Sequence, residues 1–405
     1  MTEIRLFINI GNINPIILIN IGIGIYNIYK KIMLKRFYNL EKMIKHGKVL
    51  IIYGPRRVGK TILLEEFLNK TDLKYKLDSG DNIKTQQILS SQDFSQIIEY
   101  ASGYDLIAID EAQQIPNIGM GLKILVDQVP NLRIIATGSS SFYLSQYIGE
   151  PLTGRKRTII LYPLSQMELL EKYNKYELKE NLEKFLVFGT YPEIVIAETQ
   201  KNKIMVLEEI INSYLLKDVL AIDKIKNSSQ LLKLLKLLAF QVGSEVSFNE
   251  LATQVKLDVK TVERYLDILE KAFVIKYLSS FSRNLRKEIF RKGKVYFYDN
   301  GIRNAIIENF NSLENRNDVG ALWENFIVME RIKKQAYQPI YSSNYFWRTY
   351  DQKEIDWVEE RDGKLFGYEI KWGNKKRKEP KLWKETYSNA EFKRINKENY
   401  LEFII

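Results

Sequence analysis

Three short, largely apolar runs constrain the fold of this chain more than any other feature of its sequence. They occupy residues 49–52, 106–109 and 132–136, the last interrupted only by Arg133. Each run is continuous rather than alternating, which is typical of a strand buried on both faces of a parallel sheet. Segments long enough for helices separate the runs. The pattern therefore predicts repeated βαβ units, that is, an α/β domain with a parallel sheet and covering helices.

A glycine-containing loop follows the first predicted strand. Residues 54–61 have the sequence GPRRVGKT, which fits the pattern G-x-x-x-x-G-K-[ST]. The two glycines let successive backbone N–H groups point at a phosphate, and the predicted helix 61–69 adds partial positive charge at its N-terminus. Lys60 would neutralise phosphate oxygens, and Thr61 would offer its hydroxyl to Mg²⁺. The predicted Mg-ATP site consists of Gly54, Pro55, Arg56, Arg57, Val58, Gly59, Lys60, Thr61 and Ile62.

Acidic and hydroxyl side chains follow the other two runs. Asp110 and Glu111 come after the second, and Thr137 and Ser139 after the third. Ligands of an open α/β sheet bind outside the carboxyl ends of its strands, so these side chains are expected beside the loop. Asp110 is the predicted Mg²⁺ ligand opposite Thr61, and Glu111 the group that orients the attacking water. Thr137 is the preferred γ-phosphate sensor and Ser139 the alternate, although turn chemistry alone also explains such hydroxyls.

Seven stretches of sequence occur in an order that points to a known family. They are GPRRVGKT, IAIDEAQQIPN, IIATGSSS, PLTGRKR, YPLSQMEL, FGTYPEI and KVYFYDNG, and the similarity spans roughly residues 34–373. In them the chain resembles a prokaryotic group of AAA+ ATPases with a conserved C-terminal domain of uncertain function. The hydrophobic N-terminal segment departs from that pattern.

The resemblance implies a role for one arginine. In the family a G-R pair after the sensor strand lies beside the nucleotide, which puts Arg155 forward as a contact of the γ-phosphate, in cis or from a neighbouring subunit of a homo-oligomer. Such an arginine stabilises charge on the transferring phosphoryl oxygens. Arg157 in this role, or plain surface exposure of Arg155, are the alternatives.

The middle of the chain predicts a winged helix. Residues 246–278 have the pattern strand, helix, turn, helix and strand. The second helix of such a unit can enter a major groove. Its candidate contacts are Lys260, Thr261, Arg264 and Tyr265. Protein binding or packing is equally open, because Glu263 and Asp267 would face phosphates unfavourably. The basic and aromatic stretch 281–296 favours DNA or RNA as the partner.

The last part of the chain carries a candidate metal site. Asp356 lies on one predicted hairpin strand, and Glu369 and Lys371 lie on one face of the next. This arrangement resembles PD-(D/E)XK nucleases, in which the acids bind Mg²⁺ and the lysine assists the attacking water. Glu324, on a predicted helix at 321–333, is the further acid that the fold often supplies. The alternative is a salt-bridged, non-catalytic copy of that fold.

Composition narrows the setting. The net charge of +11 favours a polyanionic partner or is simply that of a lysine-rich protein. Without cysteine there is no disulfide framework, and we expect a cytoplasmic protein. Residues 1–33 hold an uncharged stretch with five asparagines, so a membrane span is disfavoured. We interpret them as a low-complexity extension, and a native start at Met33 is one explanation of it; a membrane anchor and an added strand are the alternatives.

The predicted organisation has five parts: the extension 1–33, an AAA+ core at 34–165, a helical lid at 166–229, a winged helix at 230–285 and a nuclease-like α/β domain at 286–405. The first functional hypothesis is an ATPase that hydrolyses Mg-ATP to drive or gate interaction with a partner, with nucleic acid preferred. The alternatives are an ATP-gated regulatory protein with little turnover, and an ATP-licensed, metal-dependent nuclease.

Overall fold

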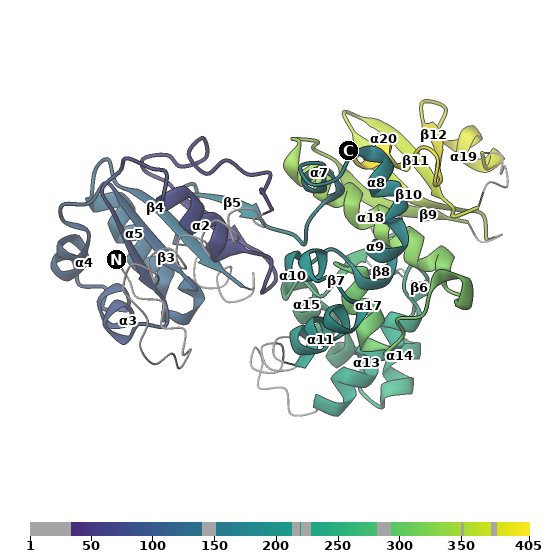
Figure 1. The fold of residues 1–405 in the computed structure, drawn as a ribbon, viewed down its shortest axis with the longest axis horizontal. Helices are drawn as coiled ribbons and strands as arrows, with labels where there is room; N and C mark the ends of the chain where they lie inside the picture. The colour runs from purple at the N-terminus through teal and green to yellow at the C-terminus, as the bar shows by residue number, and fades with distance from the viewer. Residues whose placement is uncertain are drawn as a thin grey trace, which may run out of the picture. The chain divides into compact units, whose positions relative to one another are not determined.

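The computed structural model describes residues 34–139, 151–212, 219, 228–281, 293–349, 352–373 and 379–405 (Figure 1). Contacts divide the chain into two units, Met1–Lys35 and Arg36–Ile405, and every element below belongs to the second. The predicted extension 1–33 and most of the basic stretch lie outside the described residues.

A five-stranded parallel sheet forms the first part of the second unit. Its strands are β1 (Val49–Tyr53), β2 (Tyr75–Ser79), β3 (Leu106–Asp110), β4 (Arg133–Gly138) and β5 (Lys156–Ile160). Their order is β2-β3-β4-β1-β5, and each neighbouring pair is parallel. The α/β fold with a parallel sheet, as in P-loop nucleotide-binding domains, is therefore confirmed. The three predicted strands are the three central ones, where residues are buried on both faces.

Among the described residues, four helices follow strands of this sheet in the chain. They are α2 (Lys60–Leu68), α3 (Ile83–Ser90), α4 (Phe94–Ala101) and α5 (Ile118–Gln128). The side chains of Asn82 and Asp93 cap α3 and α4 by accepting from backbone N–H groups of the first turn. Gly121 of α5 lets that helix approach α3, because a Cβ there would lie 2.3 Å from the Leu89 carbonyl oxygen. Close packing of α3 on α5 thus depends on a glycine.

The segment before β1 differs from its predicted form. The spacing of apolar residues predicts an amphipathic helix from Met33, but the described residues 34–48 contain only turns and irregular backbone. Distant contacts replace the helix: the Phe37 ring stacks on that of Tyr337, with centroids 5.0 Å apart, and Arg36 is buried. Tertiary packing here overrides helix propensity. His46 lies on an exposed turn, with Nδ1 2.6 Å from the Asn131 carbonyl oxygen.

Short helices follow the sheet, as the leucine and isoleucine spacing predicts. They are α7 (Gln166–Leu169), α8 (Lys175–Glu180), α9 (Leu182–Phe188), α10 (Pro192–Ile196), α11 (Gln200–Ile210) and α13 (Ser228–Phe240). Next come β6 (Glu245–Val246), α14 (Phe248–Val255), α15 (Val259–Lys271), β7 (Ile275–Leu278) and β8 (Gly293–Phe297), with an antiparallel sheet of order β6-β8-β7. The predicted order of strand, helix, turn, helix and strand is present; its assignment as a winged helix stays a prediction.

The last part pairs one long helix with a four-stranded sheet. It contains α17 (Asn300–Ile306), α18 (Val319–Tyr337), β9 (Ser343–Arg348), β10 (Glu354–Arg361), β11 (Lys364–Ile370), α19 (Lys381–Thr386), β12 (Glu391–Ile395) and α20 (Tyr400–Ile404). The sheet order is β12-β11-β10-β9; β11 and β12 are parallel and the other pairs antiparallel. The predicted hairpin of β10 and β11 is present, and the nuclease-like assignment stays a prediction.

Two of the sequence motifs meet in the interior. Gly189 of FGTYPEI lies against Asp299 of KVYFYDNG, because a Cβ on Gly189 would be 1.9 Å from Asp299 Oδ1. The Asp299 carboxylate accepts from the backbone N–H groups of Thr190 at 2.7 Å and Gly301 at 2.8 Å. Burial raises the pKa of Asp299 above its usual range. The hollow between them is only about 10 Å³, so this junction is a packing feature rather than a ligand site.

Candidate phosphate and magnesium site

The glycine loop connects the end of β1 to the start of α2. Gly59 has φ +91° and precedes the helix in a left-handed conformation that favours glycine. Gly54 has φ +153°, and a Cβ there would lie 2.1 Å from the Leu161 carbonyl oxygen. Both glycines are therefore required by the backbone, one by its dihedral angle and the other by close approach to the end of β5. A Cβ on Gly59 would meet no other atom within 4 Å, so its dihedral angle rather than crowding favours glycine there.

Two candidate side chains of the loop, those of Lys60 and Thr61, make hydrogen bonds in the structure. The Lys60 ammonium is buried, and its Nζ donates to the carbonyl oxygens of Gly54 at 3.0 Å and Pro55 at 2.9 Å. Thr61 Oγ1 donates to Asp110 Oδ2 at 2.8 Å. The lysine is thus folded over its own loop, and the threonine hydroxyl and the aspartate are within one hydrogen bond of each other.

A hydrogen-bonded chain continues from Asp110 across the strand ends. Thr137 Oγ1 donates to Asp110 Oδ1 and accepts from the Glu111 backbone N–H at 3.1 Å. Gln113 Nε2 donates to the Glu111 carboxylate and to Ser139 Oγ, the latter at 3.2 Å. The carboxyl ends of β3 and β4 therefore bring both predicted acids and both predicted sensor hydroxyls together. Gln113 lies in the motif IAIDEAQQIPN but is not among the predicted site residues.

A second residue absent from the predicted site is Gly80, which follows the edge strand β2. Its backbone N–H donates to the Asp110 carbonyl oxygen at 2.7 Å, and a Cβ there would lie 2.1 Å from the Glu111 carbonyl oxygen. Glu111 itself has a left-handed backbone, with φ +50°. Gly80 thus makes room for the turn that aims the Glu111 side chain, and nothing in the apolar patterning of β2 indicated this.

The side chains present fit a magnesium ion bound with a nucleotide. Mg²⁺ is usually held by one or two carboxylates together with phosphate oxygens and water. Thr61 and Asp110 supply a hydroxyl and a carboxylate at the loop. Among the described residues no group of three or more His, Cys, Asp or Glu could hold a metal ion alone. The ion at this site would therefore depend on phosphate oxygens to complete its coordination.

Arg155 lies away from this loop. The backbone N–H of Val49 donates to the Arg155 carbonyl oxygen at 2.8 Å, which places Arg155 at the start of β1, whereas the glycine loop follows its end. The intervening five-residue strand spans roughly 16 Å. Arg155 Nε instead pairs with Asp127 Oδ1 at 2.6 Å. This separation argues against contact between Arg155 and a nucleotide bound in the same chain. Contact with the nucleotide of a neighbouring copy stays a prediction.

A buried arginine outside the predicted site, Arg36, donates a hydrogen bond to the glycine loop. Arg36 Nε pairs with Glu168 Oε1 at 2.8 Å, and its Nη2 donates to the Tyr162 carbonyl oxygen at 2.7 Å. Its Nη1 donates to the carbonyl oxygen of Val58, a residue of the glycine loop. Tyr337 of α18 donates to the same glutamate at 3.2 Å. Arg36 therefore joins the loop, the segment after β5 and α18 through one side chain.

The C-terminal candidate residues are partly brought together. Glu324, Asp356 and Lys371 line one hollow of about 360 Å³. Glu369 lines a neighbouring hollow of about 480 Å³. Burial raises the pKa of Glu324 to about 7, against the attraction of Lys294. Because no three-acid metal group forms in the described residues, the C-terminal metal site stays a prediction without support from this arrangement.

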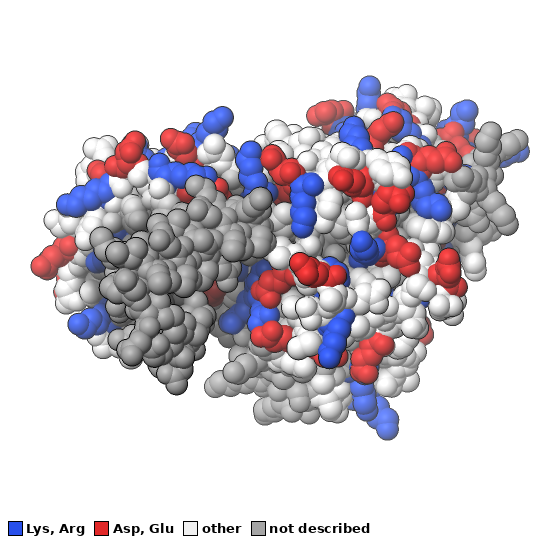
Figure 2. Space-filling model, in the orientation of Figure 1, with Lys and Arg blue, Asp and Glu red and all other residues white. Residues whose placement is uncertain are grey.

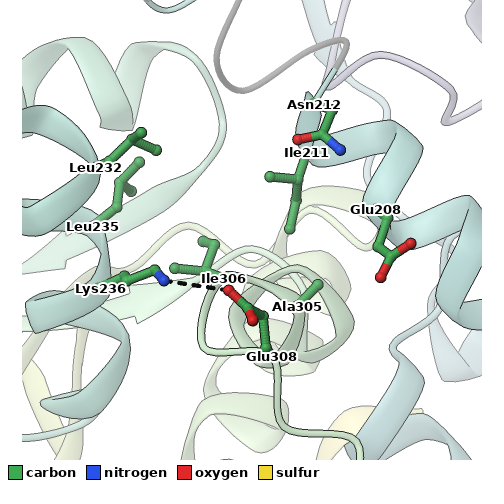
Figure 3. A pocket seen from close by; sticks show the side chains of 9 residues that line it. All are labelled: Glu208, Ile211, Asn212, Leu232, Leu235, Lys236, Ala305, Ile306 and Glu308. Atoms are coloured by element: carbon green, nitrogen blue, oxygen red, sulfur yellow. Dashed lines mark hydrogen bonds and ion pairs between the residues drawn. The ribbon is translucent and has the colours of Figure 1, made fainter. Parts of the chain in front are cut away.

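A third hollow, of about 280 Å³, lies between α11, α13 and α17 (Figure 3). Leu232 and Leu235 line one side, with Ile306 at its base. Lys236 and Glu308 form an ion pair of 3.3 Å at the exposed rim. Exposed ion pairs of this kind contribute little, and the lining residues offer no cluster of reactive groups. We assign this hollow no catalytic role.

Charge and hydropathy of the described residues add two observations. On the face drawn in Figure 2, lysine and arginine are intermixed with aspartate and glutamate rather than gathered in one basic patch. The net charge of +11 therefore does not indicate a binding surface on that face. Within the described ranges, no helix combines the length and apolar character needed to cross a membrane.

Comparison with family models covers three successive parts of the chain. Residues 46–170 match an AAA domain, which includes the glycine loop and both acids. The part of the chain that holds the glycine loop is therefore similar to an AAA domain. Residues 179–313 match a domain of unknown function (DUF8612), and residues 319–400 match another (DUF4143). The boundary between the last two falls between α17 and α18.

Three relatives share the larger part of this length. An uncharacterized protein of Mycobacterium tuberculosis is 27% identical over 82% of this chain and 72% of its own. One of Methanocaldococcus jannaschii is 24% identical over 88% and 83%, and one of Haemophilus influenzae is 27% identical over 81% and 84%. Among solved structures, a STAND (Signal Transduction ATPase with Numerous Domains) protein of Pyrococcus horikoshii has a TM-score of 0.27 and 14% identity, over 71% of this chain and 44% of that one.

Proposed function

We propose that this protein binds Mg-ATP at the glycine loop, hydrolyses it, and uses the nucleotide state to change how it holds a partner. The observation that carries the proposal is the convergence of Lys60, Thr61, Asp110 and Glu111 through the strand ends. Each residue type matches one requirement of phosphoryl transfer: neutralisation of phosphate charge, ligation of Mg²⁺ and positioning of water.

Individual roles follow from the contacts. The Lys60 ammonium exchanges the carbonyl oxygens of Gly54 and Pro55 for phosphate oxygens when a nucleotide enters the loop. Thr61 and Asp110 hold the magnesium ion, which neutralises charge on the phosphates when bound. The Glu111 carboxylate, held by Gln113, orients the attacking water and accepts its proton. Thr137 touches Asp110 and the backbone of Glu111, so it is placed to register loss of the γ-phosphate.

Replacing Lys60 by alanine tests the nucleotide site. We expect the affinity for Mg-ATP to fall by about a hundredfold or more, because the only ammonium in the loop is removed, and phosphate release to fall to background. Isothermal calorimetry and a phosphate-release assay on the whole chain measure the two quantities. Exposed Lys84→Ala on α3 serves as the control. Unchanged ATP binding by Lys60→Ala would refute the proposal, whereas tight binding by the native chain without turnover would favour an ATP-gated regulatory protein.

The proposed partner is nucleic acid, contacted through α15. Lys260 and Arg264 are exposed on that helix, which supports the proposal, while Tyr265 is only 2% exposed and is removed from the predicted contacts. Glu263 and Asp267 are exposed on the same helix and would repel phosphates, so α15 would contact only a few phosphates of the nucleic acid.

Charge reversal at α15 tests the partner. We expect Lys260→Glu with Arg264→Glu to weaken binding of labelled DNA or RNA by about tenfold or more and to flatten its salt dependence, because two cations near phosphates are lost. Fluorescence anisotropy at several salt concentrations measures both. The matched control, Lys45→Glu with Lys84→Glu, makes the same charge change at exposed positions outside α15. Equal losses in the two double variants would exclude α15 as the contact.

A further inference from the structure

A buried lysine stands at the centre of the acidic cluster in the C-terminal part. Lys294 belongs to β8, outside the β10–β11 hairpin, and its side chain is only 2% exposed. Its Nζ lies 2.9 Å from Glu324 Oε1 and 3.7 Å from Asp356 Oδ1, and it pairs with Glu354 Oε1. Three carboxylates from α18 and β10 thus surround one ammonium group.

Further donors reach two of these acids, Glu324 and Asp356. Tyr296 donates its hydroxyl to Glu324 Oε1 at 2.9 Å. Asp356 Oδ2 accepts from the Ile370 backbone N–H at 2.7 Å and from Lys371 Nζ at 2.9 Å. A divalent cation needs several of these oxygens within about 2.0 to 2.6 Å of one point. In this cluster, oxygens of these acids already accept from the lysine, tyrosine and backbone donors named above. The cluster is therefore arranged around hydrogen-bond donors rather than around an open metal position.

Charge balance supports the same conclusion. Burial by itself would lower the pKa of Lys294, but the attraction of Glu324, together with Asp356 and Glu354, raises it well above its ordinary value. Glu324 and Asp356 are buried and Glu354 is partly buried, so without a cation these acids would carry a desolvation cost, which the fixed ammonium offsets.

We propose that the Lys294 ammonium is the resident cation of this cluster and takes the place that a divalent metal would need between Glu324, Glu354 and Asp356. The native C-terminal part then binds no divalent ion at these acids and cuts nucleic acid by no metal-dependent route there. The lysine instead ties β8 to α18 and β10, and so connects the three-stranded and four-stranded sheets. The proposal does not depend on ATP hydrolysis.

Measurement of Mn²⁺ binding to the whole chain, in the absence of nucleotide, tests this proposal. The electron paramagnetic resonance signal of free Mn²⁺ reports how much of the ion stays unbound. The native protein and Asp356→Asn should take up the same amount of Mn²⁺, since Asp356 is already occupied by donors. Lys294→Gln removes the cation but keeps a hydrogen-bond donor. It should gain one site at least about tenfold tighter than any in the native chain, and the double variant Lys294→Gln with Asp356→Asn should lose it.

The ATP site contributes equally in all four proteins, because Thr61 and Asp110 are untouched. Native uptake that Asp356→Asn abolishes would overturn the proposal, as would a folded Lys294→Gln that gains no site. Circular dichroism establishes folding of each variant. Should Lys294→Gln not fold, the comparison of the native chain with Asp356→Asn decides alone: equal uptake supports the lysine as the cation and a loss refutes it.

Discussion

Glu111→Gln is expected to lower the ATP turnover number by about a hundred- to ten-thousandfold, the range that a positioned general base contributes. The affinity for Mg-ATP should stay within about threefold, because the Glu111 carboxylate accepts from Gln113 and its proposed role is to position water rather than to bind phosphate or Mg²⁺. The substituted amide keeps the shape and can still meet Gln113, but it cannot accept a proton from water. Single-turnover phosphate release and calorimetry separate the two quantities.

The exposed Glu99 of α4 provides the matched control, since Glu99→Gln makes the same chemical change away from the strand ends. It should leave turnover unaltered. A Glu111→Gln variant with native turnover would remove this carboxylate from the mechanism, even if Lys60→Ala still abolished binding. Loss of binding in Glu111→Gln would instead mean that the turn between β3 and Gln113 had collapsed.

The sequence predicted the centre of the fold well because central strands are marked by composition. Residues in β1, β3 and β4 are apolar on both faces, which few structures other than a covered parallel sheet require. The edge strands β2 and β5 went unpredicted for the corresponding reason. Each has neighbours on one side only, and polar residues such as Lys76 and Arg157 interrupt its pattern. An edge strand is defined by its partner, which a local pattern does not contain.

The same reasoning explains which site residues were predictable. Lys60, Thr61, Asp110 and Glu111 lie directly after strand signals, so that local sequence carries both their chemistry and their place. Gly80 and Arg36 act on the site through contacts between residues far apart in the chain, and no spacing encodes such contacts. Lys294 shows the converse. The hairpin acids were recognised, but the cation from β8 that meets them was not.

Arg36→Met is expected to destabilise the fold by about 3 to 5 kcal/mol, the usual cost of removing one partner of a buried ion pair. The Arg36 and Glu168 side chains are 5% and 0% exposed, so the glutamate would be left buried without its charge partner. Affinity for Mg-ATP should also weaken by about five- to tenfold, because the Val58 carbonyl in the glycine loop loses its donor. Urea unfolding and calorimetry measure the two effects.

A double-mutant cycle distinguishes the ion pair from plain loss of packing. Glu168→Gln removes the buried charge but keeps an acceptor for the Ser165 backbone N–H, which the glutamate caps at 2.9 Å. If the unpaired charge is the main cause of the destabilisation, Arg36→Met should lower the free energy of unfolding clearly less in the Glu168→Gln background than in the native chain. If the two substitutions lower the free energy of unfolding additively, the destabilisation by Arg36→Met comes from the lost side-chain volume. The loss of ATP affinity should persist in either background, because the Val58 carbonyl depends on Arg36 and not on the glutamate.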